Sequence, residues 1–326
     1  MAVPPGRRSA CTNWIGYFCV DAKTPLYALM GPTASGKTGI AIDLACHHGF
    51  ELISVDSVLV YRGLDIGSAK PSAAEQALAP HALIDIREFW QPYSAGDFRD
   101  DCAALVRGIV DRGHKPLLVG GTQLYFKALM DMNPDLPSAD AGVRAQIRAH
   151  AATDGWPALH AQLAKVDPVS AARLHPNHSS RIERALEVHR LSGRALSDFH
   201  VPSTSSAYEF RSVALVPDDR AWLHRRIAQR FELMMRAGFE DEVRGLMAHP
   251  KFEPSLTSMS AVGYRQAIMG LSDGSERAQW VERAVIASRQ LAKRQLTWLR
   301  GWPDLKVVAA ETATTDAVLS AFSDFQ

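Results

Sequence analysis

The sequence predicts an α/β protein in which helices flank a parallel β-sheet and an all-helical segment is inserted into the sheet domain. Short apolar runs alternate with helical stretches over roughly the first 130 residues, which is typical of a parallel sheet. Residues from about 139 to 199 then show helical patterns without strands, and a strand-like run follows them. Because a strand follows the helical block, we expect an insertion rather than an appended domain.

The predicted elements follow one another in a regular order. Strands are expected where apolar runs end at turn residues, at 26–30, 51–55, 83–86, 116–119 and 211–216. Helices are expected at 36–48, 95–112, 143–150, 156–165, 181–191, 220–237 and 276–300. These elements divide the chain into an N-terminal tail (1–24), a core domain (25–135 and 206–315) and a helical insertion (136–205). The stretch Pro202–Ser206 is typical of a linker.

Composition excludes several classes of protein. The chain has 326 residues, of which 47% are hydrophobic and 22% are charged, so a disordered or fibrous protein is excluded. A net charge of +1 excludes nucleic-acid binding through bulk charge, although a local basic surface remains possible. No apolar run approaches the roughly 18 residues that a membrane span needs. Four widely spaced cysteines, without a CxxC pair, are typical of a reduced compartment, so we expect a cytoplasmic protein.

One motif predicts a phosphate-binding loop, or P-loop. The sequence GPTASGKT fits G-x-x-x-x-G-K-[ST] between a predicted strand and a predicted helix. Its backbone N–H groups can converge on phosphate oxygens, and the helix N-terminus adds favourable partial charge. The lysine can reach a diphosphate and the threonine hydroxyl can bind Mg²⁺. The motif comprises Gly31, Pro32, Thr33, Ala34, Ser35, Gly36, Lys37 and Thr38.

Polar residues at two other strand ends are expected to share a crevice with the loop. Asp56 follows the strand at 51–55, and Gly120-Gly121-Thr122 follows the strand at 116–119. Ligands bind at the carboxyl ends of parallel strands, so Asp56 can act as a general base or metal ligand, or can cap the following turn. Thr122 can cap a helix or contact a substrate. Asp85, in the run at 83–86, is a weaker candidate for a metal-binding aspartate.

Basic residues form three groups along the predicted helices. Arg289, Lys293 and Arg300 lie within about 40° of one another at the helical period, and Glu282 is the only acid between Val281 and Trp302. This face either contacts phosphates or is solvated. The two other groups are Arg181, Arg184, Arg190 and Arg194, and Arg220, Arg225, Arg226 and Arg230. The last group can hold a diphosphate or form structural ion pairs.

Taken together, the motifs resemble the tRNA dimethylallyltransferase (tRNA isopentenyltransferase) family. The loop GPTASGKT, the segment ELISVDSVLVYRGLDIGSAKP at 51–71 and PHALIDI at 80–86 are similar to family signatures. The runs LVGGTQLYF at 118–126, VGYRQ at 262–266 and RQLAKRQLTWLR at 289–300 follow in the family's order. The resemblance covers about residues 24 to 303. Val58, Ser68 and Ser180 stand where Ala, Thr and Gln are commoner in the family.

The resemblance implies transfer of a dimethylallyl group from dimethylallyl diphosphate to N6 of adenosine 37 in tRNA. It implies that the P-loop holds this diphosphate rather than ATP, and that Asp56 removes the N6 proton while Thr122 supports the extruded adenine. Lys37, Arg226 and Mg²⁺ bound to Thr38 are then expected to stabilise the leaving diphosphate. The base must leave the anticodon-loop stack to react. We expect a monomer without membrane contact, with the insertion gripping the anticodon stem-loop.

The resemblance also implies a set of residues that contact tRNA. Besides Asp56 and Thr122, this set is Ser57, Val58, Leu59, Arg144, Ser180, Arg181, Ile182, Glu183, Arg184, Ala261, Val262, Gly263, Tyr264, Arg265, Lys293, Arg294, Gln295, Leu296, Thr297, Trp298, Leu299 and Arg300. Two other functions use the same loop. A small-molecule kinase would bind ATP and activate a hydroxyl with Asp56, and an RNA-binding NTPase switch would need no such carboxylate.

Overall fold

The computed structural model describes residues 23–130, 136–199 and 208–325, and within them six strands form one parallel sheet. The strands are β1 (Thr24–Met30), β2 (Phe50–Val55), β3 (His81–Ala82), β4 (Lys115–Gly120), β5 (Tyr208–Val216) and β6 (Lys306–Ala309). Their order is β3-β2-β4-β1-β5-β6. The central strand β1 pairs in parallel with β4 on one side and β5 on the other. The predicted α/β class is confirmed.

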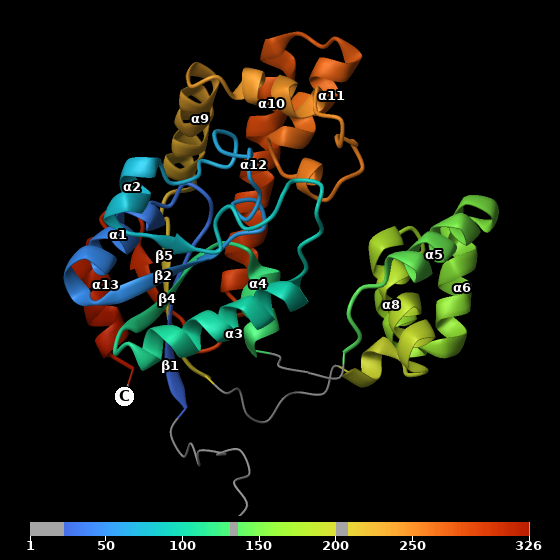
Figure 1. Cartoon of the computed structure of the whole chain (residues 1–326), viewed down its shortest axis with the longest axis horizontal. Coiled ribbons are helices and arrows are strands. Elements are labelled where there is room, and N and C mark those ends of the chain that lie inside the picture. The colour runs from blue at the N-terminus through green and yellow to red at the C-terminus, as the bar shows by residue number, and fades with distance from the viewer. Residues whose placement is uncertain (1–22, 131–135, 200–207, 326) are drawn as a thin grey trace, which may run out of the picture.

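Helices connect and cover the strands (Figure 1). They are α1 (Lys37–His48), α2 (Ala73–Leu78), α3 (Ala95–Asp111), α4 (Gln123–Met130), α5 (Ala141–Asp154), α6 (Trp156–Val166), α7 (Pro168–Arg173), α8 (Ser179–Ser192), α9 (Arg220–Arg236), α10 (Phe239–Met247), α11 (Tyr264–Asp273), α12 (Arg277–Leu299) and α13 (Thr315–Ser323). Two short 3-10 turns are η1 (Leu196–Phe199) and η2 (Ser258–Ser260). The helices expected from the sequence are all present.

The sheet is buried on both faces, as parallel strands require. On one face, Leu44 of α1 and Phe322 of α13 pack against Leu29 of β1. On the other face, Phe98 of α3 and Phe126 of α4 join a larger core that reaches α10, α11 and α12. Alternate side chains of each strand therefore belong to two different hydrophobic cores, because successive side chains point to opposite faces of the sheet.

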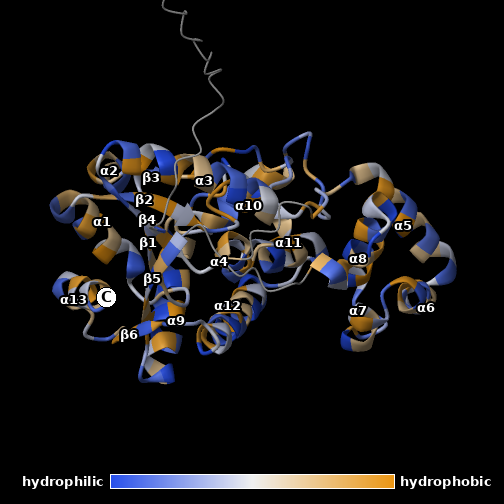
Figure 2. Ribbon diagram, turned by 90° about the horizontal axis from the view of Figure 1, so that it is seen from below, coloured by the Kyte–Doolittle hydropathy of each residue, from blue (hydrophilic) through white to orange (hydrophobic). Residues whose placement is uncertain are grey.

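The helices α5 to α8 form a core of their own. Ile147, Leu159, Leu163 and Ile182 are fully buried against one another. The four helices stand to one side of the sheet (Figure 1), and the view from below shows the same separation (Figure 2). The tail residues 1–22 and the expected linker Pro202–Ser206 lie outside the described residues.

The prediction of a strand at 83–86 is wrong. The strand is β3, which ends at Ala82 after two residues. Leu83 and Asp85 then adopt φ values of 65° and 56°, which a strand does not allow. Asp85 forms an ion pair with Lys70. In the described part of the chain, no helix is long and apolar enough to cross a membrane.

Candidate functional site

A cavity of about 770 Å³ opens at the carboxyl ends of β1, β2 and β4. The P-loop forms one part of its wall, from Thr33 to Gly39. Asp56, Val58 and Leu59 form another part, and the helices α9 and α12 close a third. Asp56 and Lys37 therefore share one cavity, as the topology of the sheet predicts.

The P-loop holds its lysine close to the backbone. Lys37 Nζ donates to the carbonyl oxygens of Gly31 (3.0 Å) and Pro32 (2.7 Å). Burial, together with the nearby charge of Arg230, lowers the pKa of Lys37 from its usual 10.5 to about 7, while the charge of Asp56 opposes this change. The ammonium thus lacks a strong anionic partner. A bound diphosphate would supply one.

Asp56 uses one carboxylate oxygen for structure. Its Oδ1 accepts hydrogen bonds from the N–H groups of Val58 (2.8 Å) and Leu59 (3.3 Å). The turn-capping alternative is therefore correct for this oxygen. Within the described residues, Oδ2 accepts no hydrogen bond, and the side chain lines the cavity. The same carboxylate is thus fixed by one oxygen and free to accept a proton with the other.

The glycines after β4 allow close contacts beside Asp56. A Cβ on Gly120 would overlap the Val55 carbonyl oxygen, and a Cβ on Gly121 would overlap the Gln295 amide nitrogen. The Gln295 side chain accepts from Thr33 N (2.9 Å) and donates to Gly121 O (3.0 Å), so it joins the P-loop to the end of β4. Sequence reasoning placed Gln295 among the tRNA contacts and did not foresee this bridge.

Thr122 stabilises the turn that carries Asp56. Its hydroxyl accepts a hydrogen bond from Ser57 N (3.1 Å), and its own N–H donates to the Val55 carbonyl (3.2 Å). Its carbonyl oxygen accepts from Tyr125 N in the first turn of α4. The hydroxyl therefore serves the neighbouring strand end rather than capping α4.

The arginines of α9 separate into different environments. Arg225 pairs with Asp219, as the ion-pair alternative requires. Arg226 donates to the P-loop carbonyl of Ala34 (2.8 Å) and lines the cavity. Arg230 reaches deeper and donates to Ser68 O (2.9 Å); burial lowers the pKa of its guanidinium, and the charge of Asp56 opposes the change. Sequence reasoning chose Arg226 as the diphosphate arginine; the spacing of one helical turn could have suggested Arg230 as well.

A glutamate behind the cavity fixes the loop that meets Arg230. The carboxylate of Glu242 accepts from the N–H groups of Asp65 (3.0 Å), Ile66 (2.7 Å) and Gly67 (3.1 Å). It also accepts from the hydroxyl of Tyr264 (2.6 Å). The position of Ser68, and through it that of Arg230, therefore depends on α10 and α11.

The expected tRNA contacts of the insertion are only partly exposed. Arg144 and Arg184 both pair with the buried carboxylate of Glu187, at 2.9 and 2.6 Å. Ile182 and Glu183 are buried inside the helical cluster. Ser180 and Arg181 are exposed at the start of α8.

The expected tRNA contacts of the core domain are also mixed. Val262 lines the cavity, whereas Gly263 and Tyr264 are buried and Arg265 is exposed. On α12, Gln295 and Leu299 are buried, and Leu296 and Trp298 are partly buried. Ala261, before α11, is also partly buried. The exposed members of this expected set are Lys293, Arg294 and Thr297 on α12, and Arg300 directly after it.

A metal ion could be held at one point of the site. Thr38 lines the cavity, and in the described residues its hydroxyl has no hydrogen-bond partner. No group of three His, Cys, Asp or Glu residues in the described chain could bind a metal through protein ligands alone. One hydroxyl completed by phosphate and water oxygens suits Mg²⁺, which keeps several waters when bound.

Fold and site together define an α/β protein with a P-loop-type sheet, in which the loop that carries the P-loop motif and a carboxylate line one cavity. The family model described as IPP transferase matches residues 59–302, and the model described as isopentenyl transferase matches residues 24–91. The chain belongs to the IPP transferase family.

Relatives of known name and structure are similar over nearly the whole chain. The tRNA dimethylallyltransferase of Paracidovorax citrulli is 55% identical over 300 residues, covering 87% of this chain and 86% of the relative. That of Albidiferax ferrireducens is 51% identical over 316 residues, covering 91% and 90%. The tRNA isopentenylpyrophosphate transferase of Bacillus halodurans superposes with a TM-score of 0.68 at 34% identity, and the match covers 92% of this chain and 95% of that structure. A eukaryotic dimethylallyltransferase acting on tRNA gives 0.78 at 23% identity, covering 93% and 79%, and so supports the fold.

Proposed function

We propose that this protein transfers the dimethylallyl group of dimethylallyl diphosphate to N6 of adenosine 37 in tRNA and releases diphosphate. The observation that carries the proposal is the shared cavity of Lys37 and Asp56. It offers a cationic phosphate-binding wall and a carboxylate within one space, which an alkyl transfer from a diphosphate to an amine needs. The names of the relatives support the same substrates.

The P-loop wall binds the leaving group. The backbone N–H groups of the loop and Lys37 hold the diphosphate, and Arg226 and Arg230 approach it from α9. Lys37 gains an anionic partner on binding, so its pKa rises and the ammonium is charged in the complex. Thr38 would hold Mg²⁺, which supplies further neutralisation of the diphosphate charge.

The opposite wall binds the acceptor base. The exocyclic amine of adenine is a weak nucleophile, because its lone pair is delocalised into the ring. Oδ2 of Asp56 accepts the N6 proton as N6 bonds to C1 of the dimethylallyl group, and the electron pair of the breaking C–O bond leaves with the diphosphate oxygen. Thr122 keeps Asp56 in place through Ser57. The adenine must be extruded from the anticodon loop to enter the cavity.

The remaining tRNA lies outside the cavity, against the insertion and the exposed end of α12. Arg181 and Ser180 present polar groups at the N-terminus of α8, where phosphates bind favourably. Arg144 and Arg184 take part by holding Glu187 and the start of the insertion. The insertion (136–205) acts as the domain that grips the anticodon stem-loop, and the protein works as a cytoplasmic monomer.

The test is direct transfer of label. Wild-type protein is incubated with unmodified tRNA, Mg²⁺ and dimethylallyl diphosphate labelled in the allyl group, and the modified nucleoside is identified after digestion. We expect label on adenosine 37, and none on a matched tRNA in which that base is guanosine. Labelled ATP in place of the prenyl donor tests the kinase alternative. Phosphoryl transfer without prenyl transfer would refute the proposal.

A further inference from the structure

A buried glutamine of α12, Gln295, is held against the start of the P-loop. Its Oε1 accepts a hydrogen bond from Thr33 N (2.9 Å), and its Nε2 donates to Gly121 O (3.0 Å). The residue is only 8% exposed, and it lines the cavity. One partner is a donor and the other an acceptor, so together they fix which way the amide points. The Gln295 oxygen therefore faces the P-loop.

The N–H group of Thr33 is thus a P-loop donor that is already occupied. Nearby, Ser35 N donates to the carbonyl oxygen of Pro32 (3.3 Å), and Pro32 itself has no N–H to offer. The donors left for a phosphate lie toward the N-terminus of α1, which begins at Lys37 and whose first N–H groups have no partner within the helix. A phosphate oxygen and the Gln295 oxygen are both acceptors, so they would compete for Thr33 N.

The place of Gln295 corresponds to the outer end of a chain of phosphates. In a P-loop that binds a nucleoside triphosphate, the loop N–H groups hold the inner phosphates and the lysine reaches the outer two. Here Lys37 Nζ lies against the carbonyl oxygens of Gly31 and Pro32, at the start of the loop. The outer end of a phosphate chain therefore points toward Thr33, and a third phosphate would have to displace the Gln295 amide.

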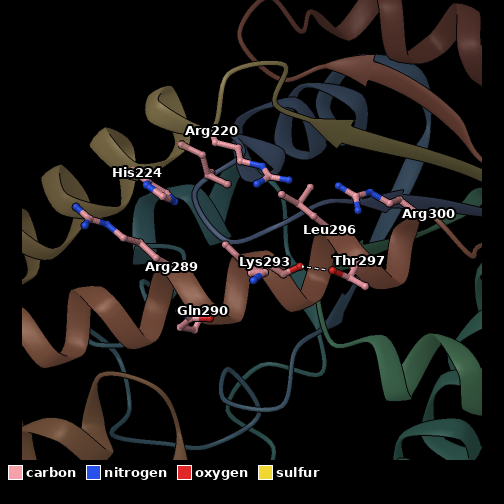
Figure 3. Close-up of a pocket in the computed structure, with 10 residues that line it drawn as sticks. Arg220, His224, Arg289, Gln290, Lys293, Leu296, Thr297 and Arg300 are labelled. Carbon is pink, nitrogen blue, oxygen red and sulfur yellow. Dashed lines mark hydrogen bonds between the residues drawn. The ribbon is translucent and has the colours of Figure 1, made fainter.

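The wall of the cavity that α12 forms offers no cation to a third phosphate. Within the described chain, the residues of α12 that line the cavity are Ser288, Leu291 and Gln295, and none of them is charged. The basic side chains of Arg289 and Lys293 line a separate pocket of about 200 Å³ between α9 and α12 (Figure 3). The additional negative charge of a third phosphate would thus enter the cavity without a cation from this helix, which is unfavourable.

We propose that Gln295 limits the P-loop to a diphosphate, because its side chain takes the place of a third phosphate. It is then a specificity-determining residue, and the ligands that it excludes are triphosphates, nucleoside triphosphates among them. This inference rests on the proposed function, in which the ligand is a prenyl diphosphate. Displacing Gln295 would leave Thr33 N and Gly121 O to find new partners, and a third phosphate can serve only the first of these two groups.

Substitutions of Gln295 separate the occupied space from the hydrogen bond. Gln295→Ala empties the place and frees Thr33 N, and Gln295→Asn shortens the side chain by one carbon but keeps the amide. Gln295→Leu fills most of the same volume without an acceptor. Gln279→Ala is the control, because Gln279 is exposed near the other end of α12.

The measurement compares two ligands that differ by one phosphate. The affinities of full-length protein for dimethylallyl diphosphate and dimethylallyl triphosphate are determined by calorimetry with Mg²⁺. The ratio of the two affinities is compared between variants, because a loss that affects both ligands equally, such as partial unfolding, cancels in the ratio.

We expect wild type, Gln295→Leu and the control to bind the diphosphate at least about tenfold more tightly than the triphosphate. Gln295→Ala should lower this preference at least about fivefold, because the third phosphate gains Thr33 N, and Gln295→Asn should lower it in the same direction. The proposal is overturned by a wild-type protein without the preference, or by a preference that survives in both shortened variants. Loss of the preference in Gln295→Leu also overturns it, because the space is still filled there.

Failure of the proposed function would give a different result. A wild-type protein that prefers the diphosphate but transfers no prenyl group to tRNA refutes the proposed function and leaves the role of Gln295 intact. A wild-type protein that transfers the prenyl group equally well from the triphosphate refutes the role of Gln295 and leaves the proposed function intact. If neither prenyl ligand binds, inorganic diphosphate and inorganic triphosphate replace them, with the same ratios as criteria.

Discussion

Replacing Lys37 by methionine should stabilise the ligand-free protein while abolishing turnover. The folded protein holds the pKa of Lys37 at about 7, whereas the unfolded chain restores it to 10.5. The difference of about 3.5 corresponds to about 4.8 kcal/mol that the charged lysine costs the folded state. Because the ammonium faces a cavity that water enters, we expect the actual free-energy cost to be about half of this value. The lost hydrogen bonds to Gly31 and Pro32 cost about 1 kcal/mol. The net gain is then about 1–2 kcal/mol.

The stability of the wild-type protein should depend on pH because of Lys37. Between pH 7 and 10.5 the unfolded chain binds more protons at this position than the folded protein, so wild-type stability rises with pH. The penalty is complete below pH 7 and absent above pH 10.5. The advantage of Lys37→Met should therefore shrink between these limits.

Urea unfolding at pH 6.5 and 9.5, without diphosphate, measures the effect. Lys251→Met is the control, because Lys251 is exposed outside the cavity and should leave stability unchanged. A Lys37→Met protein that is less stable than wild type at pH 6.5, or an advantage that does not change with pH, would refute the argument. The same pKa predicts that diphosphate binding takes up a proton, so diphosphate affinity should fall as pH rises above about 7.

Three further substitutions test the site and its support. Asp56→Asn should keep tRNA binding but lose about 10²–10⁴-fold in single-turnover prenyl transfer, because the base is lost; unchanged turnover would exclude this role. Gly67→Ala should destabilise the protein by about 1–3 kcal/mol in thermal unfolding, because a Cβ would overlap the rings of Phe239 and Tyr264; an unaltered Tm would contradict that packing. Glu242→Gln removes one acceptor from the loop below Ser68, so the KM for dimethylallyl diphosphate should rise while the KM for tRNA does not; parallel changes in both constants would indicate general unfolding instead.

Much of the sheet could be predicted because its signals are local. The strands β1, β2 and β4 are apolar runs directly followed by Gly31, Asp56 and Gly121, and the loop motif fixes the first of these ends. Their convergence follows from parallel topology alone. The prediction at 83–86 failed because an apolar run does not reveal the left-handed backbone at Leu83 and Asp85.

The parts of the site that could not be predicted depend on contacts distant in sequence. Gln295 bonds to Thr33 of the P-loop, which is 262 residues away in the sequence. Glu242 bonds to the loop at 65–67, which is at least 175 residues away in the sequence. Helical periodicity indicates which residues share a face, but it does not say which element that face meets. For the same reason, the helical spacing of Arg226 and Arg230 did not reveal that Arg230 lies deeper in the structure.

The helix α12 is used on two faces, and this limits its evolution. Gln295 on one face holds the P-loop, while Arg289 and Lys293 on another face line a small pocket between α12 and α9. Insertion or loss of one residue between them would turn the rest of the helix by about 100°. Either change would break the hydrogen bond of Gln295 to the P-loop or turn the basic side chains away from α9. We therefore expect relatives to vary the composition of this helix far more readily than its length.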